Sequence, residues 1–406
     1  MPNYKRLKYA CYTSNLTMSV VGGLSPVLFL TFRSLYGISY SLLGLLVLVC
    51  FLTQLTIDLI FTFFSEKFNI PKVVKSMPLI AAIGLSVYAL FPFLFPEYAY
   101  IGLVVGTVIF SLAAGLGEVL ISPIIASIPS ENPDKEMSKL HSIYAWGVVF
   151  IVIISTLYLY IFGHKNWQWL ALLLTTIPLV SFLLYRVKDI PVSKNESEES
   201  TTVHFLKDKG VWLCVIGIFL GGAAECSMAQ WCSGYLEQAL GIDKIWGDIF
   251  GAALFSAMLG LGRSLYAKIG KNIGRVLFFG AIGAAICYFA AAVATPLIGL
   301  IACGFTGFCV SMMWPGSLIV ASDRYPKGGV LIFALMAAGG DLGASVGPQI
   351  IGILADFSMK NRHLIEFAEK IQLAPDKLGL KIGMIFGMLF PLFAIFVYSR
   401  FLKKKA

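Results

Sequence analysis

The feature that most constrains this chain is a series of long apolar runs that recur along all of its 406 residues. A helix needs about 20 apolar residues to cross the hydrocarbon core of a bilayer, and the runs repeat at about that length. A signal peptide or single anchor would occupy one end only and is therefore excluded as the explanation of these runs. The runs predict twelve membrane-spanning helices, over Tyr9 to Phe32, Tyr40 to Phe64, Met77 to Phe95, Tyr98 to Ile128, Leu140 to Phe162, Trp167 to Tyr185, Val211 to Leu236, Gly247 to Tyr266, Val276 to Ala292, Leu297 to Ala321, Gly329 to Phe357 and Ile382 to Phe401.

Composition supports an all-α membrane protein. Apolar residues make up 58% of the chain and charged residues 13%, against about 25% charged residues in soluble domains. The cysteines all fall in apolar spans without a CxxC pair, so we interpret them as small buried side chains rather than disulfides or metal ligands. We expect no cofactor and no metal ion. The cysteines are Cys11, Cys50, Cys214, Cys226, Cys232, Cys287, Cys303 and Cys309.

The basic residues predict how the chain is oriented. With twelve spans, 23 of the 31 Lys and Arg residues fall at the two termini and in the even-numbered loops, and eight fall in the odd-numbered loops. Short cytoplasmic loops are enriched in Lys and Arg. We therefore expect a multi-pass protein of the cell membrane with both termini in the cytoplasm. The net charge of +9 is explained by this topology and by anionic inner-leaflet lipid, not by nucleic-acid binding.

A polar linker divides the chain into equal halves. Residues 193–202 lack apolar periodicity and are predicted to be disordered. The predicted organisation is an N-terminal six-helix bundle (1–185), a cytoplasmic linker (186–210) and a C-terminal six-helix bundle (211–406). Two bundles joined in this way can rock about a central site, as alternating access requires.

Two loops carry a resemblance to a known family. Ser65 to Lys72 follows the second span and Gly262 to Lys271 follows the eighth, and both place basic, apolar and Asn or Gly residues in the same order. They resemble the signature loop of the major facilitator superfamily, although Thr62, Pro71 and Tyr266 replace residues of its usual form. The resemblance implies two six-helix bundles and secondary transport.

Shorter segments are similar to the fucose–proton symporters of that superfamily. The resemblance implies a functional glutamate at Glu118, five residues before Pro123. The acid that those symporters carry in their first span is absent, and Asn15, Thr17 and Ser19 are the polar residues there. The similar segments are Ala114 to Glu118, Ser122 to Pro123, Lys139 to Gly147, Pro315, and Gly339 to Gly340.

Acids within the spans are the main candidates for ion coupling. A charged side chain at a helix centre costs ~2.5–3.5 kcal/mol on insertion scales. No Lys or Arg falls in the central part of a predicted span, so we expect these acids to lack a cationic partner, and burial then favours their neutral form. We predict proton coupling by Glu118 and Glu225, and gating by Asp58, Arg263 and Asp341. A structural hydrogen bond is the alternative for the glutamates, and packing for Asp341.

Aromatic and amide side chains at mid-span depth are candidates for solute binding. Aromatic rings stack on the apolar faces of sugars, and amides bind hydroxyl groups. Tryptophans that face lipid are the alternative. The predicted solute-binding residues are Asn15, Gln54, Trp146, Gln230, Trp231 and Trp314.

One outer segment departs from the pattern of short loops. Met359 to Lys381 is long and charged, and Arg362 to Gln372 has the spacing of a short amphipathic helix. We interpret this segment either as a lid over the outer side or as a solvated loop.

We expect a monomeric secondary transporter of a sugar or related metabolite, driven by a proton or sodium gradient. A multidrug or metabolite exporter of the same fold is the alternative. A membrane-embedded enzyme is disfavoured, because only four histidines occur and they are scattered. A receptor that transports nothing remains open.

The predicted topology can be tested with cysteines at two positions. Ser197→Cys should react with a membrane-impermeant maleimide only after cells are permeabilised, because the linker is predicted to be cytoplasmic. Gln372→Cys, on the predicted outer side, is the control and should react in intact cells. Strong labelling of Ser197→Cys in intact cells would contradict the topology.

Overall fold

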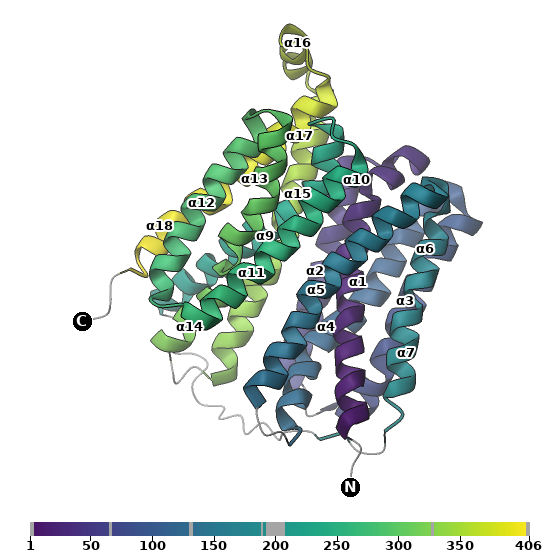
Figure 1. Cartoon of the computed structure of the whole chain (residues 1–406), viewed down its shortest axis with the longest axis vertical. Helices are drawn as coiled ribbons and strands as arrows, with labels where there is room; N and C mark the ends of the chain where they lie inside the picture. Colours follow the sequence, from purple (N-terminus) through teal and green to yellow (C-terminus); the bar gives the residue numbers. More distant parts are fainter. Residues whose placement is uncertain are drawn as a thin grey trace. The chain divides into compact units, whose positions relative to one another are not determined.

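The computed structural model describes residues 4–64, 67–129, 133–187, 190–191, 208–325 and 329–402. Within these residues, twelve helices or helix pairs are long and apolar enough to span a membrane, which confirms the predicted fold class. The predicted disordered stretch, 193–202, lies outside the described residues. The spans, in chain order (Figure 1), are α1 (Tyr4–Tyr36), α2 (Tyr40–Phe64), α3 (Ile70–Leu94), α4 (Ala99–Ser127), α5 (Pro133–Phe162), α6 (Trp167–Leu174) with α7 (Thr176–Leu184), α9 (Lys209–Gln238), α10 (Lys244–Gly247) with the π-helix η5 (Asp248–Ala253) and α11 (Leu254–Ile269), α12 (Ile273–Val293), α13 (Pro296–Val310) with α14 (Met313–Arg324), α15 (Gly329–Lys360), and α17 (Pro375–Gly387) with α18 (Leu389–Ser399).

The helices pack into two compact units. The N-terminal unit comprises Met1–Thr31 and Val49–Ser197, and the C-terminal unit comprises Phe32–Leu48 and Glu198–Ala406. The end of α1 and the start of α2 therefore pack with the second half of the chain. The division into bundles at residues 185 and 211 stays a prediction about which helices move together.

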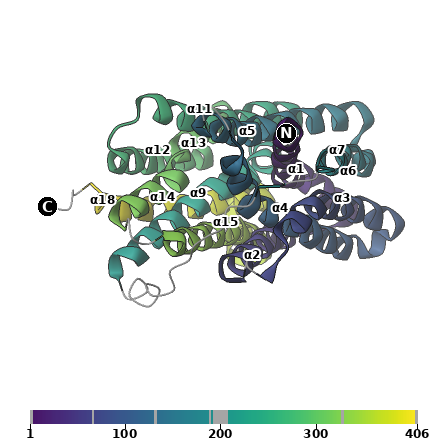
Figure 2. The ribbon, with the colours of Figure 1, turned by 90° about the horizontal axis from the view of Figure 1, so that it is seen from below.

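The centre of the C-terminal unit is the contact between α9 and α15. Gly339, Gly343 and Gly347 are four residues apart on α15, so they lie along one side of the helix and face α9. A Cβ atom at Gly347 would lie 2.8 Å from the Ala223 carbonyl oxygen. Small residues at this spacing allow two helix backbones to approach closely in a membrane. Seen from below, α9 lies beside both α14 and α15 (Figure 2).

The N-terminal unit uses the same device between α3 and α4. A Cβ atom at Gly106 on α4 would lie 2.6 Å from the Cα of Tyr88 on α3. Helix α1 is tied to α7 by hydroxyl groups, because Ser14 Oγ lies 2.8 Å from Ser181 Oγ and Ser181 Oγ donates to the Ala10 carbonyl. These contacts hold α3 against α4 and α1 against α7.

In the C-terminal unit, the start of α2 is capped by a side chain of α15. The first N–H groups of any helix lack partners within the helix. The Asp356 carboxylate accepts hydrogen bonds from Tyr40 N–H at 3.1 Å and from Ser41 N–H at 2.7 Å, and also from the Ser41 hydroxyl. The next donor, Leu42 N–H, reaches Ser39 Oγ at 3.3 Å. A negative charge at this position also interacts favourably with the helix dipole.

Aromatic contacts surround this cap. The Trp231 indole on α9 donates from Nε1 to the Pro348 carbonyl at 2.9 Å, and its ring meets the Tyr40 ring edge-on with centroids 5.8 Å apart. The Arg33 guanidinium lies 4.0 Å from the Tyr40 ring centroid. The Phe32–Leu48 segment is thus fixed to α9 and α15 by polar and aromatic contacts together.

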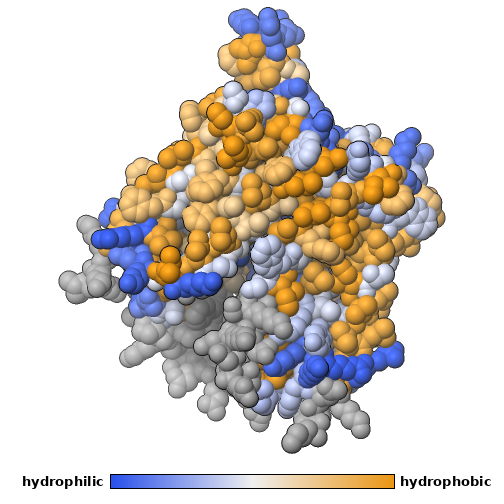
Figure 3. Space-filling model, viewed as in Figure 1, coloured by the Kyte–Doolittle hydropathy of each residue, from blue (hydrophilic) through white to orange (hydrophobic). Residues whose placement is uncertain are grey.

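A short helix, α16 (Arg362–Lys370), confirms the amphipathic helix predicted between the last two spans. Ala368 is buried, whereas Phe367 and Ile371 are about half exposed. The helix projects beyond α17 in Figure 1, and its tip is hydrophilic in Figure 3. On the face drawn in Figure 3, hydrophobic side chains cover the middle of the helices, as lipid contact requires.

The cap predicts a measurable loss of stability. Asp356→Ala should lower the unfolding temperature of the detergent-purified protein by about 1–2 °C, because a lost N-cap costs ~1–2 kcal/mol and the unfolding entropy of a chain of this length is ~0.85 kcal/mol per degree. Glu366→Ala is the matched control, since Glu366 forms an exposed ion pair with Arg362 on α16 and such pairs add little stability. Equal shifts in the two variants would contradict a specific role for the cap.

Candidate functional site

The tenth span is broken in its middle, and proline explains one consequence of the break. Helix α13 ends at Val310 and α14 begins at Met313. Pro315 has no N–H group and therefore cannot donate to the carbonyl of Ser311, four residues earlier. That carbonyl accepts a hydrogen bond from Arg263 Nε of α11 at 3.0 Å instead. Broken helices of this kind often form binding sites in transporters.

Arg263 also forms an ion pair with Glu225 of α9. Its Nη2 atom lies 3.0 Å from Glu225 Oε1 and 3.2 Å from Oε2. The Glu225 side chain is 14% exposed and the Arg263 side chain 35% exposed. Two spans are therefore joined by a partly buried charge pair, to which the tenth span contributes a carbonyl group.

This pair corrects the expectation that the acids in the spans lack cationic partners. The expectation is wrong for Glu225. Arg263 lies near the end of the predicted span Gly247 to Tyr266 and inside α11, which continues to Ile269. The long aliphatic stem of an arginine then lets its charged end reach a neighbouring helix.

Trp314 lies on the tenth span and contacts α9, the helix that carries Glu225. Its six-membered ring packs against two glycines, because a Cβ atom at Gly340 of α15 would lie 2.7 Å from it and one at Gly222 of α9 would lie 3.0 Å from it. The ring is half-buried, and Asp341 beside Gly340 is buried. Glu225 is three residues from Gly222, about one helical turn along α9. The C-terminal unit therefore brings an aromatic ring and an ion pair close together.

The N-terminal unit brings two acids together. Helices α2 and α4 cross closely at Gly115, where a Cβ atom would lie 3.1 Å from the Cα of Gln54. Asp58 is one turn beyond Gln54 and Glu118 is one turn beyond Gly115. A carboxylate oxygen of Asp58 lies within 4.8 Å of one of Glu118. Asp58 is buried and Glu118 exposed, and among the described residues no Lys or Arg forms an ion pair with Glu118.

Other predicted solute-binding residues take part in internal contacts. Asn15 donates to the Leu140 carbonyl at 2.6 Å, and Gln54 donates to the Cys50 carbonyl at 3.3 Å. Trp231 is buried in the contacts around the α2 cap described above. Asn15 and Trp231 thus join different helices, whereas the Gln54 hydrogen bond lies within α2. The roles of all three in binding stay predictions.

The remaining two differ in exposure. Gln230 is buried, whereas Trp146 on α5 is 67% exposed. Asn15, Gln54 and Trp146 belong to the N-terminal unit, and Gln230, Trp231 and Trp314 to the C-terminal unit. Within its own unit, Trp314 lies about one helical turn along α9 from Glu225.

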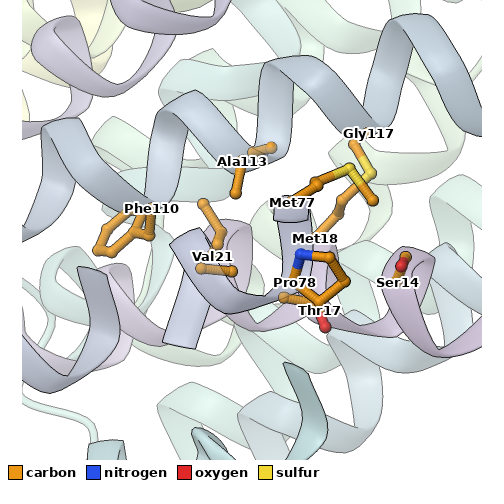
Figure 4. A pocket seen from close by; sticks show the side chains of 11 residues that line it. Ser14, Thr17, Met18, Val21, Met77, Pro78, Phe110, Ala113 and Gly117 are labelled. Carbon is orange, nitrogen blue, oxygen red and sulfur yellow. The ribbon is translucent and has the colours of Figure 1, made fainter. Parts of the chain in front are cut away.

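The N-terminal unit also contains a pocket. It is a small hollow between α1, α3 and α4 (Figure 4). Its walls are apolar apart from the Ser14 and Thr17 hydroxyl groups, and Met18 and Phe110 contribute bulky side chains. A polar solute would lose most of its hydrogen bonds there. We interpret this pocket as space between packed helices.

Two buried acids were missing from the predicted set. Asp356 caps α2, and Asp248 at the start of η5 is fully buried, with Lys244 Nζ 3.2 Å from its carboxylate and a short hydrogen bond from Ser233. Both acids lie near the ends of their predicted spans, where sequence alone gives no reason to expect burial. The sequence did contain a sign that the Ser311 carbonyl needs another partner. Pro315, four residues later, has no N–H group to donate to it.

The sequence model of the Major Facilitator Superfamily matches residues 10–358, which is most of the chain. The chain belongs to the major facilitator superfamily. It is therefore a transporter of the membrane. A search of curated proteins found no match, and the more specific resemblance to fucose–proton symporters stays a prediction.

Solved structures of other transporters share the fold. A bacterial homolog of the human lysosomal transporter Spinster is 14% identical with a TM-score of 0.73, and the match covers 99% of this chain and 97% of that one. The D-xylose-proton symporter is 16% identical with a TM-score of 0.70, covering 96% and 97%. The nucleoside transporter NupG is 13% identical with a TM-score of 0.73, covering 98% and 100%. At these identities the comparisons show the fold alone.

Proposed function

We propose that the protein is a proton-driven symporter of a small neutral polar solute, a sugar or a related metabolite, and that it works by alternating access. The observation that carries this proposal is the pair of acids, Asp58 and Glu118, on adjacent spans of the N-terminal unit. The D-xylose-proton symporter shows that this fold can carry a sugar together with protons.

The chemistry of the pair suits a proton. Two carboxylates within 4.8 Å of each other repel strongly where the surroundings are apolar, and one bound proton removes the repulsion. Glu118 is exposed and can exchange this proton with water, whereas Asp58 is buried. We therefore assign the coupling proton to Glu118, with Asp58 as the neighbour that favours its uptake.

Neutralising Glu118 should separate exchange from accumulation. In proteoliposomes, one proton per solute and a gradient equivalent to 100 mV allow at most about 50-fold accumulation. Glu118→Gln resembles the protonated form and should keep solute exchange while accumulation falls to about one-fold. Glu118→Ala should impair both. The measurement is uptake of radiolabelled sugars with a pH gradient, a sodium gradient or no gradient.

Glu97→Gln is the matched control, because Glu97 is an exposed acid in the short helix Pro96–Tyr98 of the same unit. It should accumulate solute as the wild type does. Normal accumulation by Glu118→Gln would refute its coupling role, and uptake driven only by sodium would refute the choice of ion. Outward movement of solute against its gradient would instead favour an exporter.

A further inference from the structure

The ion pair in the C-terminal unit has donors and acceptors that its internal contacts leave available. Arg263 uses Nε for the Ser311 carbonyl and Nη2 for Glu225. Among the described residues, its Nη1 atom makes no hydrogen bond. A carboxylate has about four acceptor sites, and at Glu225 the contacts within the described residues come from Arg263. The pair is partly exposed, so a solute can reach both groups.

We propose that Glu225 and Arg263 together bind two adjacent hydroxyl groups of the solute while Trp314 contacts its apolar face. This rests on the proposed function in one respect, since it takes the transported solute to be a small neutral molecule. It adds the residues that select the solute and the chemical feature that they recognise, a vicinal diol on a ring.

The charge of the pair determines the charge of the solute. Glu225 and Arg263 are neutral in sum, and the site lies within membrane spans where an uncompensated charge is costly. A neutral solute leaves this balance unchanged. An anionic solute would meet the Glu225 carboxylate and would bring a net charge into the span. The site therefore selects neutral molecules over acids of the same shape.

The hydrogen-bonding pattern determines which neutral molecules fit. Each hydroxyl group can donate one hydrogen bond and accept others. A guanidinium only donates and a carboxylate only accepts, so two neighbouring hydroxyls can satisfy both groups at once. Hydrogen bonds to charged groups are stronger than those between neutral groups, and an analogue without one of the hydroxyls leaves a charged group unsatisfied.

Position and rigidity support the same assignment. The Trp314 ring contacts Gly222, and Glu225 lies one turn further along α9, a rise of about 5 Å that is close to the width of a sugar ring. Arg263 is held by the Ser311 carbonyl, which is available because Pro315 cannot bond to it. A group fixed in this way loses less conformational freedom when it binds a solute.

The test compares neutral sugars with their acids. Binding to purified protein is measured as the rise in unfolding temperature with D-glucose, D-xylose, L-fucose, 2-deoxy-D-glucose and D-glucuronate. Wild type should prefer at least one of the three intact neutral sugars over D-glucuronate by tenfold or more. If D-glucose is the sugar bound, 2-deoxy-D-glucose should bind about tenfold more weakly where the lost hydroxyl belonged to the recognised pair.

Charge variants then separate recognition from packing. Glu225→Gln leaves Arg263 without its counter-charge, so the ratio of D-glucuronate affinity to neutral-sugar affinity should rise at least tenfold. The double variant Glu225→Gln with Arg263→Gln is neutral again and should return this ratio toward the wild-type value. A purely structural role would weaken all sugars by the same factor. Glu237→Gln, on the same helix and paired with Lys244, should leave the ratio unchanged.

The outcomes separate this inference from the proposed coupling. Unchanged preference in Glu225→Gln, while wild type binds a neutral sugar, would overturn the inference and leave proton-driven uptake untouched. Binding of none of the neutral sugars would also overturn it. A third outcome is a shifted ratio of D-glucuronate to neutral-sugar affinity in Glu225→Gln, together with wild-type uptake that does not depend on the pH gradient. It would support the inference and refute the proposed proton coupling.

Discussion

Backbone N–H and C=O groups that lie in hydrocarbon must find partners inside the protein, because lipid offers none. Uninterrupted helices meet this requirement by themselves. Where a helix starts or breaks, a side chain from another helix supplies the missing partner. Asp356 of α15 does so for the first N–H groups of α2, and Arg263 of α11 does so for the Ser311 carbonyl. Polar side chains in the spans are thus part of the architecture before they are part of any mechanism.

Close approach of the helices brings these side chains within reach of one another. The glycines at 339, 343 and 347 let α15 lie against α9, and Gly115 lets α4 lie against α2. The candidate groups sit at or beside these crossings, with Trp314 against Gly222 and Gly340, and Glu118 one turn from Gly115. A larger residue at such a crossing would separate the helices and the polar groups together. Small residues therefore contribute to the site without touching a solute.

Much of the fold follows from the sequence, because a span is a local property of about 20 residues. Apolar runs located the twelve spans, and spacing located the helix at Arg362–Lys370. The pairing of Arg263 with Glu225 could not be obtained in this way, because it joins residues 38 positions apart and depends on how far α11 extends. The burial of Trp231 depends on Tyr40, which is equally remote in the chain. Pro315 was the one local sign of a tertiary contact. Because it has no N–H group, the Ser311 carbonyl must accept a hydrogen bond from elsewhere, and Arg263 donates it.

The cap at the start of α2 has a mechanical consequence. Helices α1 and α2 each pass from one compact unit to the other, between Thr31 and Phe32 and between Leu48 and Val49. The segment that joins them, residues 32–48, is held in the C-terminal unit by the Asp356 carboxylate and by the aromatic contacts of Tyr40. Any displacement of one unit would therefore stress residues 32–48 and shear both α1 and α2. Either the two helices bend near these boundaries, or the segment loses contacts such as the two hydrogen bonds from Tyr40 and Ser41 N–H to Asp356. The strength of these contacts therefore limits how much movement α1 and α2 transmit.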